Sequence, residues 1–190
     1  MGSQVNWQDK FNAALGYQKF LEAHGGPEHR QRWQIVYEQA ALNDAQTALL
    51  RGFVRQMNVI CLAGAWCGDC VNQCPIFQRF AESSGKIDLR FLDRDVHKDV
   101  QNELSINDGH RVPVLVFLAE DFQECGRYGD RTISKYRDMA RAQIGAACPT
   151  GIGTQDQSLL QAVTREWLNE FERAQLMLRL SPRLREKHGD

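Results

Sequence analysis

The stretch from residue 58 to residue 83 constrains the fold more than any other part of the chain. An apolar, partly β-branched run at 58–63 ends at Gly64, which is typical of a buried strand. The sequence Trp-Cys-Gly-Asp-Cys follows at 66–70, and residues 71–83 can form a helix. The two cysteines therefore fall at the junction between a predicted strand and a predicted helix.

The elements predicted downstream continue this alternation of strands and helices. Residues 87–92 alternate like a half-buried strand, and residues 97–104 can form a short helix. Residues 112–118 have the strongest strand pattern in the chain, and a turn at 119–121 leads to another strand at 122–128. The order indicates an α/β fold whose last two strands are antiparallel neighbours.

Helical patterns flank this alternating region. A first helix is predicted at about 6–23, where Gly25-Gly26-Pro27 ends the apolar spacing, and further helical stripes continue to about residue 57. On the other side a helix starts near Ile133, and residues 149–154 have the composition of a loop. Helical spacing returns at 160–180, after which the basic and polar tail is expected to fray.

The length of 190 residues favours one decorated domain over two independent ones. We predict an N-terminal helical extension at 1–56, a central α/β domain at 57–148, and a C-terminal helical extension at 149–190. The C-terminal extension is expected to pack on the same domain because its apolar residues recur at helical spacing.

The charge balance argues against two classes of partner. The 23 Lys and Arg residues nearly equal the 24 Asp and Glu residues, which leaves a formal charge of −1 and no long-range field for nucleic acid or an anionic membrane. No apolar stretch approaches the ~18 residues that a membrane-spanning helix needs, and the first residues lack the pattern of a secretory signal. We therefore expect a cytoplasmic protein.

The spacing of Cys67 and Cys70 suits thiol–disulfide exchange. That reaction needs a thiolate that attacks and a second thiol close enough to resolve the mixed disulfide. A cysteine at a helix N-terminus meets unpaired backbone N–H groups that favour its negative charge, so Cys67 should attack and Cys70 should resolve. Asp69 places a carboxylate beside both sulfurs, which opposes thiolate formation at Cys67.

Two other interpretations of the cysteines stay open at this stage. Half of a zinc site has the same Cys-x-x-Cys spacing, and Cys74 lies one helical turn beyond Cys70, as a third ligand would. We expect no metal and no cofactor, because no fourth ligand has a recognisable spacing. The other alternative is a redox-silent adaptor that uses the same fold to hold a protein partner.

The residues around the cysteine pair resemble the thioredoxin family. Its active site reads Trp-Cys-Gly-x-Cys, as residues 66–70 do, and Pro75 stands where its helix is kinked, eight positions after the first cysteine. Pro113 corresponds to the family's cis-proline and Gly129 to the glycine that ends its last strand. The resemblance covers about 57–147. With Asp69 and the added helices, the chain looks like a bacterial thioredoxin-like branch with a Cys-Gly-Asp-Cys centre.

The resemblance implies a thioredoxin-like three-layer fold with a central mixed sheet, and a thiol–disulfide oxidoreductase that acts on protein or small-thiol disulfides and is restored by an external reductant. Cys67 and Cys70 would be catalytic, and the substrate would meet the residues Trp66, Gly68, Asp69, Val112, Pro113 and Gly129. A cis Val112–Pro113 bond would point the Val112 backbone at the sulfurs, where an extended peptide could pair with it.

Three further expectations concern single residues. The family has a buried aspartate where Cys61 stands here, so another group must take the proton if that role survives. A cysteine in a buried strand is more often a small apolar residue than a reactant, and Cys74 is expected to be an extra thiol or a filler. We interpret Arg127, Asp130 and Arg131 as solvated charges.

Overall fold

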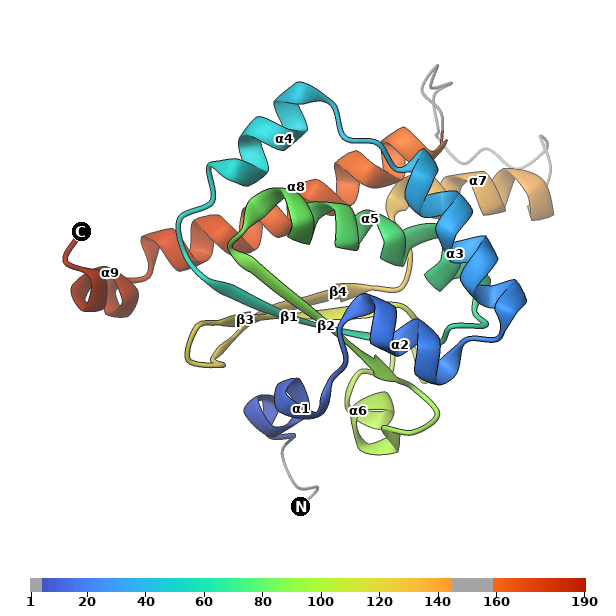
Figure 1. Ribbon diagram of the computed structural model, residues 1–190, viewed down its shortest axis with the longest axis horizontal. Coiled ribbons are helices and arrows are strands. Elements are labelled where there is room, and N and C mark those ends of the chain that lie inside the picture. The colour runs from blue at the N-terminus through green and yellow to red at the C-terminus, as the bar shows by residue number, and fades with distance from the viewer. Residues whose placement is uncertain (1–4, 145–158) are drawn as a thin grey trace.

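Four strands form one mixed sheet at the centre of the molecule (Figure 1). The computed structural model describes residues 5–144 and 159–190. The sheet order is β2-β1-β3-β4; β1 pairs in parallel with β2 and antiparallel with β3, which is antiparallel to β4. The strands span Met57–Ala63 (β1), Ile87–Asp93 (β2), Val114–Ala119 (β3) and Glu124–Gly129 (β4). The predicted α/β fold with a mixed sheet is confirmed.

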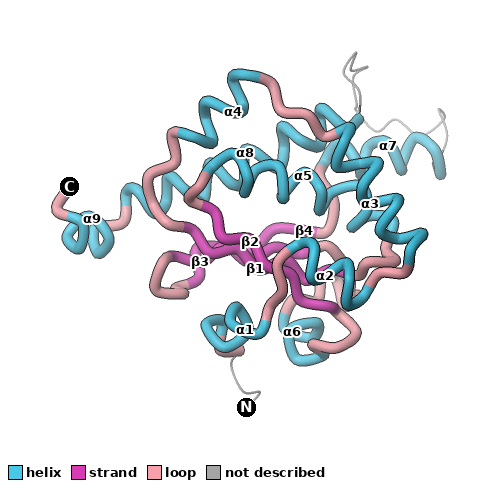
Figure 2. Tube along the Cα trace, viewed as in Figure 1, coloured by secondary structure: helices cyan, strands magenta, loops and turns pink. Residues whose placement is uncertain are grey.

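Helices cover both faces of this sheet, so that strands lie between helical layers (Figure 2). In Figure 1, α5 and α8 lie above the sheet, with α3 and α4 beside them, and α1 and α6 lie below it. The helices span Trp7–Ala13 (α1), Tyr17–His24 (α2), Pro27–Gln39 (α3), Asp44–Arg51 (α4), Gly68–Ser84 (α5), Lys98–Glu103 (α6), Ile133–Ile144 (α7), Leu159–Leu180 (α8) and Pro182–His188 (α9).

The position of β1 explains its composition. It lies between two other strands and beneath helices, and all seven of its residues are buried. A strand covered on both faces is a continuous apolar run and does not alternate. Strand β2 lies at the edge of the sheet and begins with alternating buried and half-buried residues, as its sequence predicts.

The single N-terminal helix predicted at 6–23 is wrong. The chain leaves α1 at Ala13 and begins α2 at Tyr17, and Leu15 between them exchanges two backbone hydrogen bonds with Phe91 of β2. The N–H of Leu15 donates at 2.9 Å and its carbonyl accepts at 2.7 Å. The helix breaks because this pairing satisfies the backbone of Leu15 at the open edge of the sheet.

Helix α8 is part of the core. Trp167 and Phe171 are fully buried, and Phe171 lies 5.1 Å, centroid to centroid, from Phe117 of the sheet. The N-terminal helices, the sheet and α8 share one apolar core. The predicted domain boundary at residue 57 stays a prediction. The predicted boundary at residue 149 and the predicted loop at 149–154 lie outside the described residues.

The tail after Leu180 differs from the expectation that it frays. Pro182 begins α9, a further short helix in which Leu184 is buried, and His188 and Lys187 contact Glu120 at the tip between β3 and β4. Pro at a first helical position is preorganised for helix, which explains the restart.

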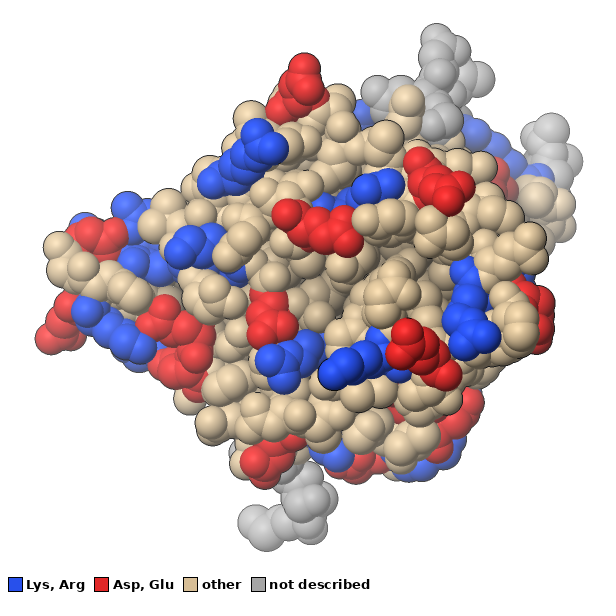
Figure 3. All heavy atoms as spheres, viewed as in Figure 1, with Lys and Arg blue, Asp and Glu red and all other residues tan. Residues whose placement is uncertain are grey.

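The surface mixes charges of both signs. On the face in Figure 3, acidic and basic side chains are interspersed among other residues, in keeping with the formal charge of −1. Within residues 5–144 and 159–190, no helix combines the length and apolarity needed to cross a membrane.

Candidate active site

The cysteine pair lies where β1 leads into α5. Cys67 is the N-cap of α5 with extended backbone (φ −75°, ψ 127°), and its carbonyl accepts the N–H of Val71 at 2.9 Å. Its N–H in turn donates to Gly64 at 3.0 Å, which fixes the turn between strand and helix. Cys67 is partly exposed and Cys70 is fully buried. One sulfur is therefore open to solvent, and the other lies behind it.

The two thiols titrate as a pair. Burial opposes ionisation of Cys70, but hydrogen bonds from the thiols of Cys67 and Cys74 and from the N–H of Gly64 lower the pKa of Cys70 to about 5. The hydrogen bond with Cys70 is the main cause that raises the pKa of Cys67, and burial raises it further. The two shifts have opposite signs because a proton held between the two sulfurs stabilises a single negative charge on the pair.

The Val112–Pro113 segment, which leads directly into β3, faces Cys67. The peptide bond between these residues is cis, and the Cys67 sulfur lies 3.7 Å from the Val112 carbonyl oxygen. Gly129 pairs with Val114 at the end of β4, and a methyl group on Gly129 would lie only 2.6 Å from the Pro113 carbonyl oxygen. Gly129 is therefore needed for close packing of β4 against this segment.

Trp66 and Gly68 form the open rim on either side of Cys67. Trp66 keeps 47 % of its surface exposed, and the guanidinium of Arg94 lies 5.3 Å from its ring centroid. Gly68 is also exposed. A large exposed aromatic ring beside the accessible sulfur offers a contact surface to a partner.

Near Gly129, Asp130 and Arg131 are not the solvated charges that the sequence predicts, whereas Arg127 is exposed and pairs with Glu103 and Glu124 at the surface. Arg131 donates to one carboxylate oxygen of Asp69 at 2.6 Å and 2.9 Å, and both side chains are four-fifths buried. Asp69 therefore presents a neutralised carboxylate to the sulfurs. Burial raises the pKa of Cys70 more than the charge of Asp69 does.

Asp130 anchors this cluster from inside the protein. Its carboxylate is almost fully buried and accepts from Arg131 at 3.2 Å, from Arg111 at 3.4 Å and from the Tyr136 hydroxyl. Burial raises the pKa of Asp130, but its hydrogen bonds and the nearby arginines outweigh this and leave it lowered. No sequence pattern indicates this network, because its members are brought together only by the fold.

Gln73 connects the site to the C-terminal helix. Its amide nitrogen donates to the backbone carbonyls of Asp69 at 3.2 Å and Asp130 at 3.0 Å, and its oxygen accepts from the Trp167 indole at 2.7 Å. The side chain is buried, so these bonds hold α5, the loop after β4 and α8 together. No pattern in the sequence around Gln73 predicts this role.

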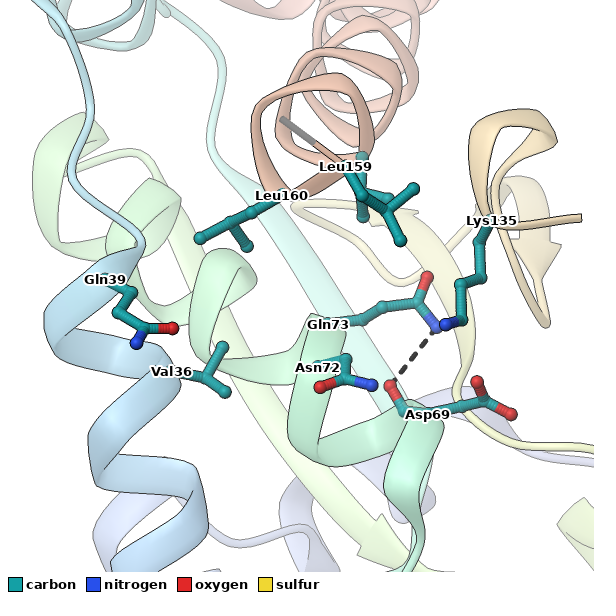
Figure 4. A pocket seen from close by; sticks show the side chains of 9 residues that line it. Val36, Gln39, Asp69, Asn72, Gln73, Lys135, Leu159 and Leu160 are labelled. Carbon is teal, nitrogen blue, oxygen red and sulfur yellow. Dashed lines mark hydrogen bonds between the residues drawn. The ribbon is translucent and has the colours of Figure 1, made fainter. Parts of the chain in front are cut away.

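A hollow of about 180 Å³ adjoins the site beside Asp69 (Figure 4). Its walls come from α3, α5, α7 and α8 and combine apolar side chains with amides and one ammonium group. The lining consists of Val36, Gln39, Asp69, Asn72, Gln73, Lys135, Leu159, Leu160 and Val163.

The clustered cysteines are not arranged as a set of metal ligands in the part of the chain that the structure describes. No group of three or more His, Cys, Asp and Glu side chains there is arranged to hold a metal ion. Cys61, Cys67, Cys70, Cys74 and Cys125 are free thiols in the described residues. Cys148 lies outside them.

The ion pair between Arg131 and Asp69 gives a direct prediction. In Arg131→Gln the carboxylate loses its partner and repels a thiolate, so the alkylation rate of Cys67 by iodoacetamide near neutral pH should fall by about tenfold, the equivalent of one pKa unit. In the double variant Arg131→Gln/Asp69→Asn the rate should return to within about threefold of wild type. A double variant as slow as the single one would show that Arg131 acts without Asp69.

The fold and the site together define a thioredoxin-fold protein with a dithiol at the start of α5, the helix that follows its first strand. A family model described as Thioredoxin matches residues 15–142, more than half of the chain. The chain therefore belongs to the thioredoxin family. The match begins well before residue 57, so helices α2, α3 and α4 also lie within the matched region.

Solved structures agree on the fold. A protein of unknown function from Pseudomonas aeruginosa is 15 % identical and has a TM-score of 0.70, with 90 % of this chain and 97 % of that chain covered. An HIV epitope scaffold is 16 % identical with a TM-score of 0.60, covering 90 % and 93 % of the two chains. At these identities the likeness concerns the fold alone. No curated protein matches the chain.

Proposed function

We propose that the protein is a thiol–disulfide oxidoreductase that reduces or exchanges disulfides of proteins or small thiols. The observation that carries the proposal is the asymmetry of the pair: a partly exposed Cys67 at the N-cap of α5 and a fully buried Cys70 hydrogen-bonded to it. An open sulfur can meet a substrate disulfide, and a second sulfur within reach can release the product.

The reaction proceeds in two exchanges. The Cys67 thiolate attacks one sulfur of the substrate disulfide, which forms a mixed disulfide and expels the other substrate sulfur as a thiolate. Cys70 gives up its proton, which the expelled substrate thiolate takes up, and the Cys70 thiolate then attacks the sulfur of Cys67. This forms the Cys67–Cys70 disulfide and releases the second substrate sulfur as a thiolate. The substrate gains two electrons, and an external dithiol reductant restores the pair. We place the reaction in the cytoplasm, where such reductants are maintained.

The substrate would bind across the open rim. Trp66 offers an apolar surface, and the backbone of Val112 lies within hydrogen-bonding reach of Cys67. An extended peptide could place its disulfide over Cys67 while its backbone pairs with Val112. Gly68 and Asp69 border the same opening, and Pro113 and Gly129 support Val112 from behind.

Insulin reduction by dithiothreitol tests this function. Wild-type protein should accelerate precipitation of the insulin B chain, and Cys67→Ser should leave only the rate of dithiothreitol alone. The matched control is Cys125→Ser, which replaces a cysteine on β4 and should retain the wild-type rate. Equal rates with and without wild-type protein would instead favour a redox-silent adaptor.

A further inference from the structure

Behind the cysteine pair, two more thiols continue into the core. Cys74 lies one helical turn beyond Cys70 on α5, and Cys61 lies on β1 beneath the helix. Both are fully buried, as Cys70 is, and the sulfurs of Cys61 and Cys74 are 3.8 Å apart. Neither Cys61 nor Cys74 takes part in the proposed exchange reaction, although both lie directly behind Cys70, its resolving cysteine.

The resolving step creates a problem for a buried sulfur. Cys70 must carry a negative charge in the core, and an isolated charge there is costly unless hydrogen-bond donors surround it. In the free dithiol Cys67 is one such donor, but in the mixed disulfide its sulfur is bonded to the substrate and has no proton. The N–H of Gly64, 3.4 Å from the Cys70 sulfur, and the Cys74 thiol remain as donors.

Cys74 is suited to stay protonated and donate. Burial, followed by hydrogen bonds with Cys61 and Cys70, raises the pKa of Cys74 well above that of an ordinary thiol. The titratable groups facing the pair Cys70 and Cys74 are Cys67 and Asp69 from α5, Cys61 from β1, and Tyr17 from α2. The Tyr17 hydroxyl is buried and has no hydrogen-bond partner among the residues that the structure describes. Burial raises the pKa of Tyr17 most, and the charge of Cys74 raises it further.

We propose that Cys74 is a positioning residue for the second exchange: its thiol donates to the buried Cys70 thiolate while that thiolate attacks Cys67, and contact with Cys61 holds Cys74 in place. The Cys74 proton is not transferred in this step; it stays on its sulfur. The inference rests on the proposed function, because it concerns the resolution of a mixed disulfide on Cys67.

The two steps can be timed separately with dithiobis(nitrobenzoate). Attack by Cys67 releases the first nitrothiobenzoate ion, and resolution by Cys70 releases the second. The full chain is used, with Cys125 and Cys148 replaced by serine so that absorbance reports the remaining thiols. Stopped-flow traces over a range of pH are recorded for this parent, Cys74→Ala, Cys74→Ser and Val71→Ala. Val71 is also buried on α5, so its replacement removes comparable volume without removing a donor.

Loss of the Cys74 donor should slow only the second release. In Cys74→Ala we expect it to be about tenfold slower near neutral pH, with its pH profile moved upward by about one unit, while the first release is unchanged. Cys74→Ser keeps a donor and should recover most of the rate. Val71→Ala should lose stability and keep the parent pH profile.

Two outcomes would overturn the inference. An unchanged second release and pH profile in Cys74→Ala would show that the donor is not needed. If Cys74→Ala does not fold, Cys74→Ser is compared with Cys74→Val, which lacks a donor. Equal shifts of the pH profile of the second release in these two variants would show that a hydroxyl donor gives no rescue. Absence of any second release in the parent would instead contradict the proposed function itself.

Discussion

Replacing Cys70 with serine is expected to abolish turnover while preserving attack on the substrate. Without the resolving thiol, the mixed disulfide on Cys67 can be released only by an outside thiol, so it should accumulate. Insulin reduction should fall to the dithiothreitol background, and affinity purification of Cys70→Ser should yield partners linked through Cys67. Because Cys70 is fully buried and serine is nearly isosteric, the fold should persist.

The matched control is the double variant Cys67→Ser/Cys70→Ser, which keeps the same surface but lacks the attacking sulfur. It should capture no disulfide-linked partner. Capture of the same partners by the double variant, or trapping through another cysteine, would contradict the assignment of Cys67 as the attacking group.

The second large effect concerns stability. Trp167→Ala is expected to lower the free energy of unfolding by about 3–5 kcal/mol, the usual range for removing a fully buried tryptophan. Trp167 is 0 % exposed, and its ring centroid lies 4.5 Å from that of Phe77 and 4.9 Å from that of Tyr128. Its loss also leaves the oxygen of Gln73 without its indole donor. Urea unfolding followed by circular dichroism measures the change.

Trp66→Ala is the control for this measurement because it makes the same chemical change at a half-exposed position. Its free energy of unfolding should change by less than about 1 kcal/mol. Similar losses in the two variants would mean that α8 does not form part of the core.

The sequence predicts the centre of this fold well because its signals are local. The uninterrupted apolar run of β1, the cysteines at its end and the apolar pattern of α5 lie within one continuous stretch, and each element is recognisable from its own residues. The last two strands are predicted for the same reason. The predicted strand at 112–118 begins two residues too early, because β3 starts at Val114, after the Val112–Pro113 segment.

The errors concern contacts between residues far apart in the chain. Leu15 pairs with Phe91, and this long-range pairing overrides the helical pattern that spans residues 6–23. Arg131 and Asp69 are 62 residues apart, so the sequence shows two charges and conceals their pairing. The sequence conceals the contact between Cys61 and Cys74 in the same way, because it forms only when α5 packs against β1.

The most direct test of the central claim is to locate the disulfide and the reactive thiol by mass spectrometry. The protein is equilibrated in mixtures of reduced and oxidised dithiothreitol, quenched, and mapped by peptide analysis; reduced protein is also treated with limiting iodoacetamide. We expect one disulfide that forms and opens reversibly between Cys67 and Cys70, and first alkylation at Cys67. A reversible disulfide at a different pair, or alkylation of Cys70 before Cys67, would contradict the proposed mechanism.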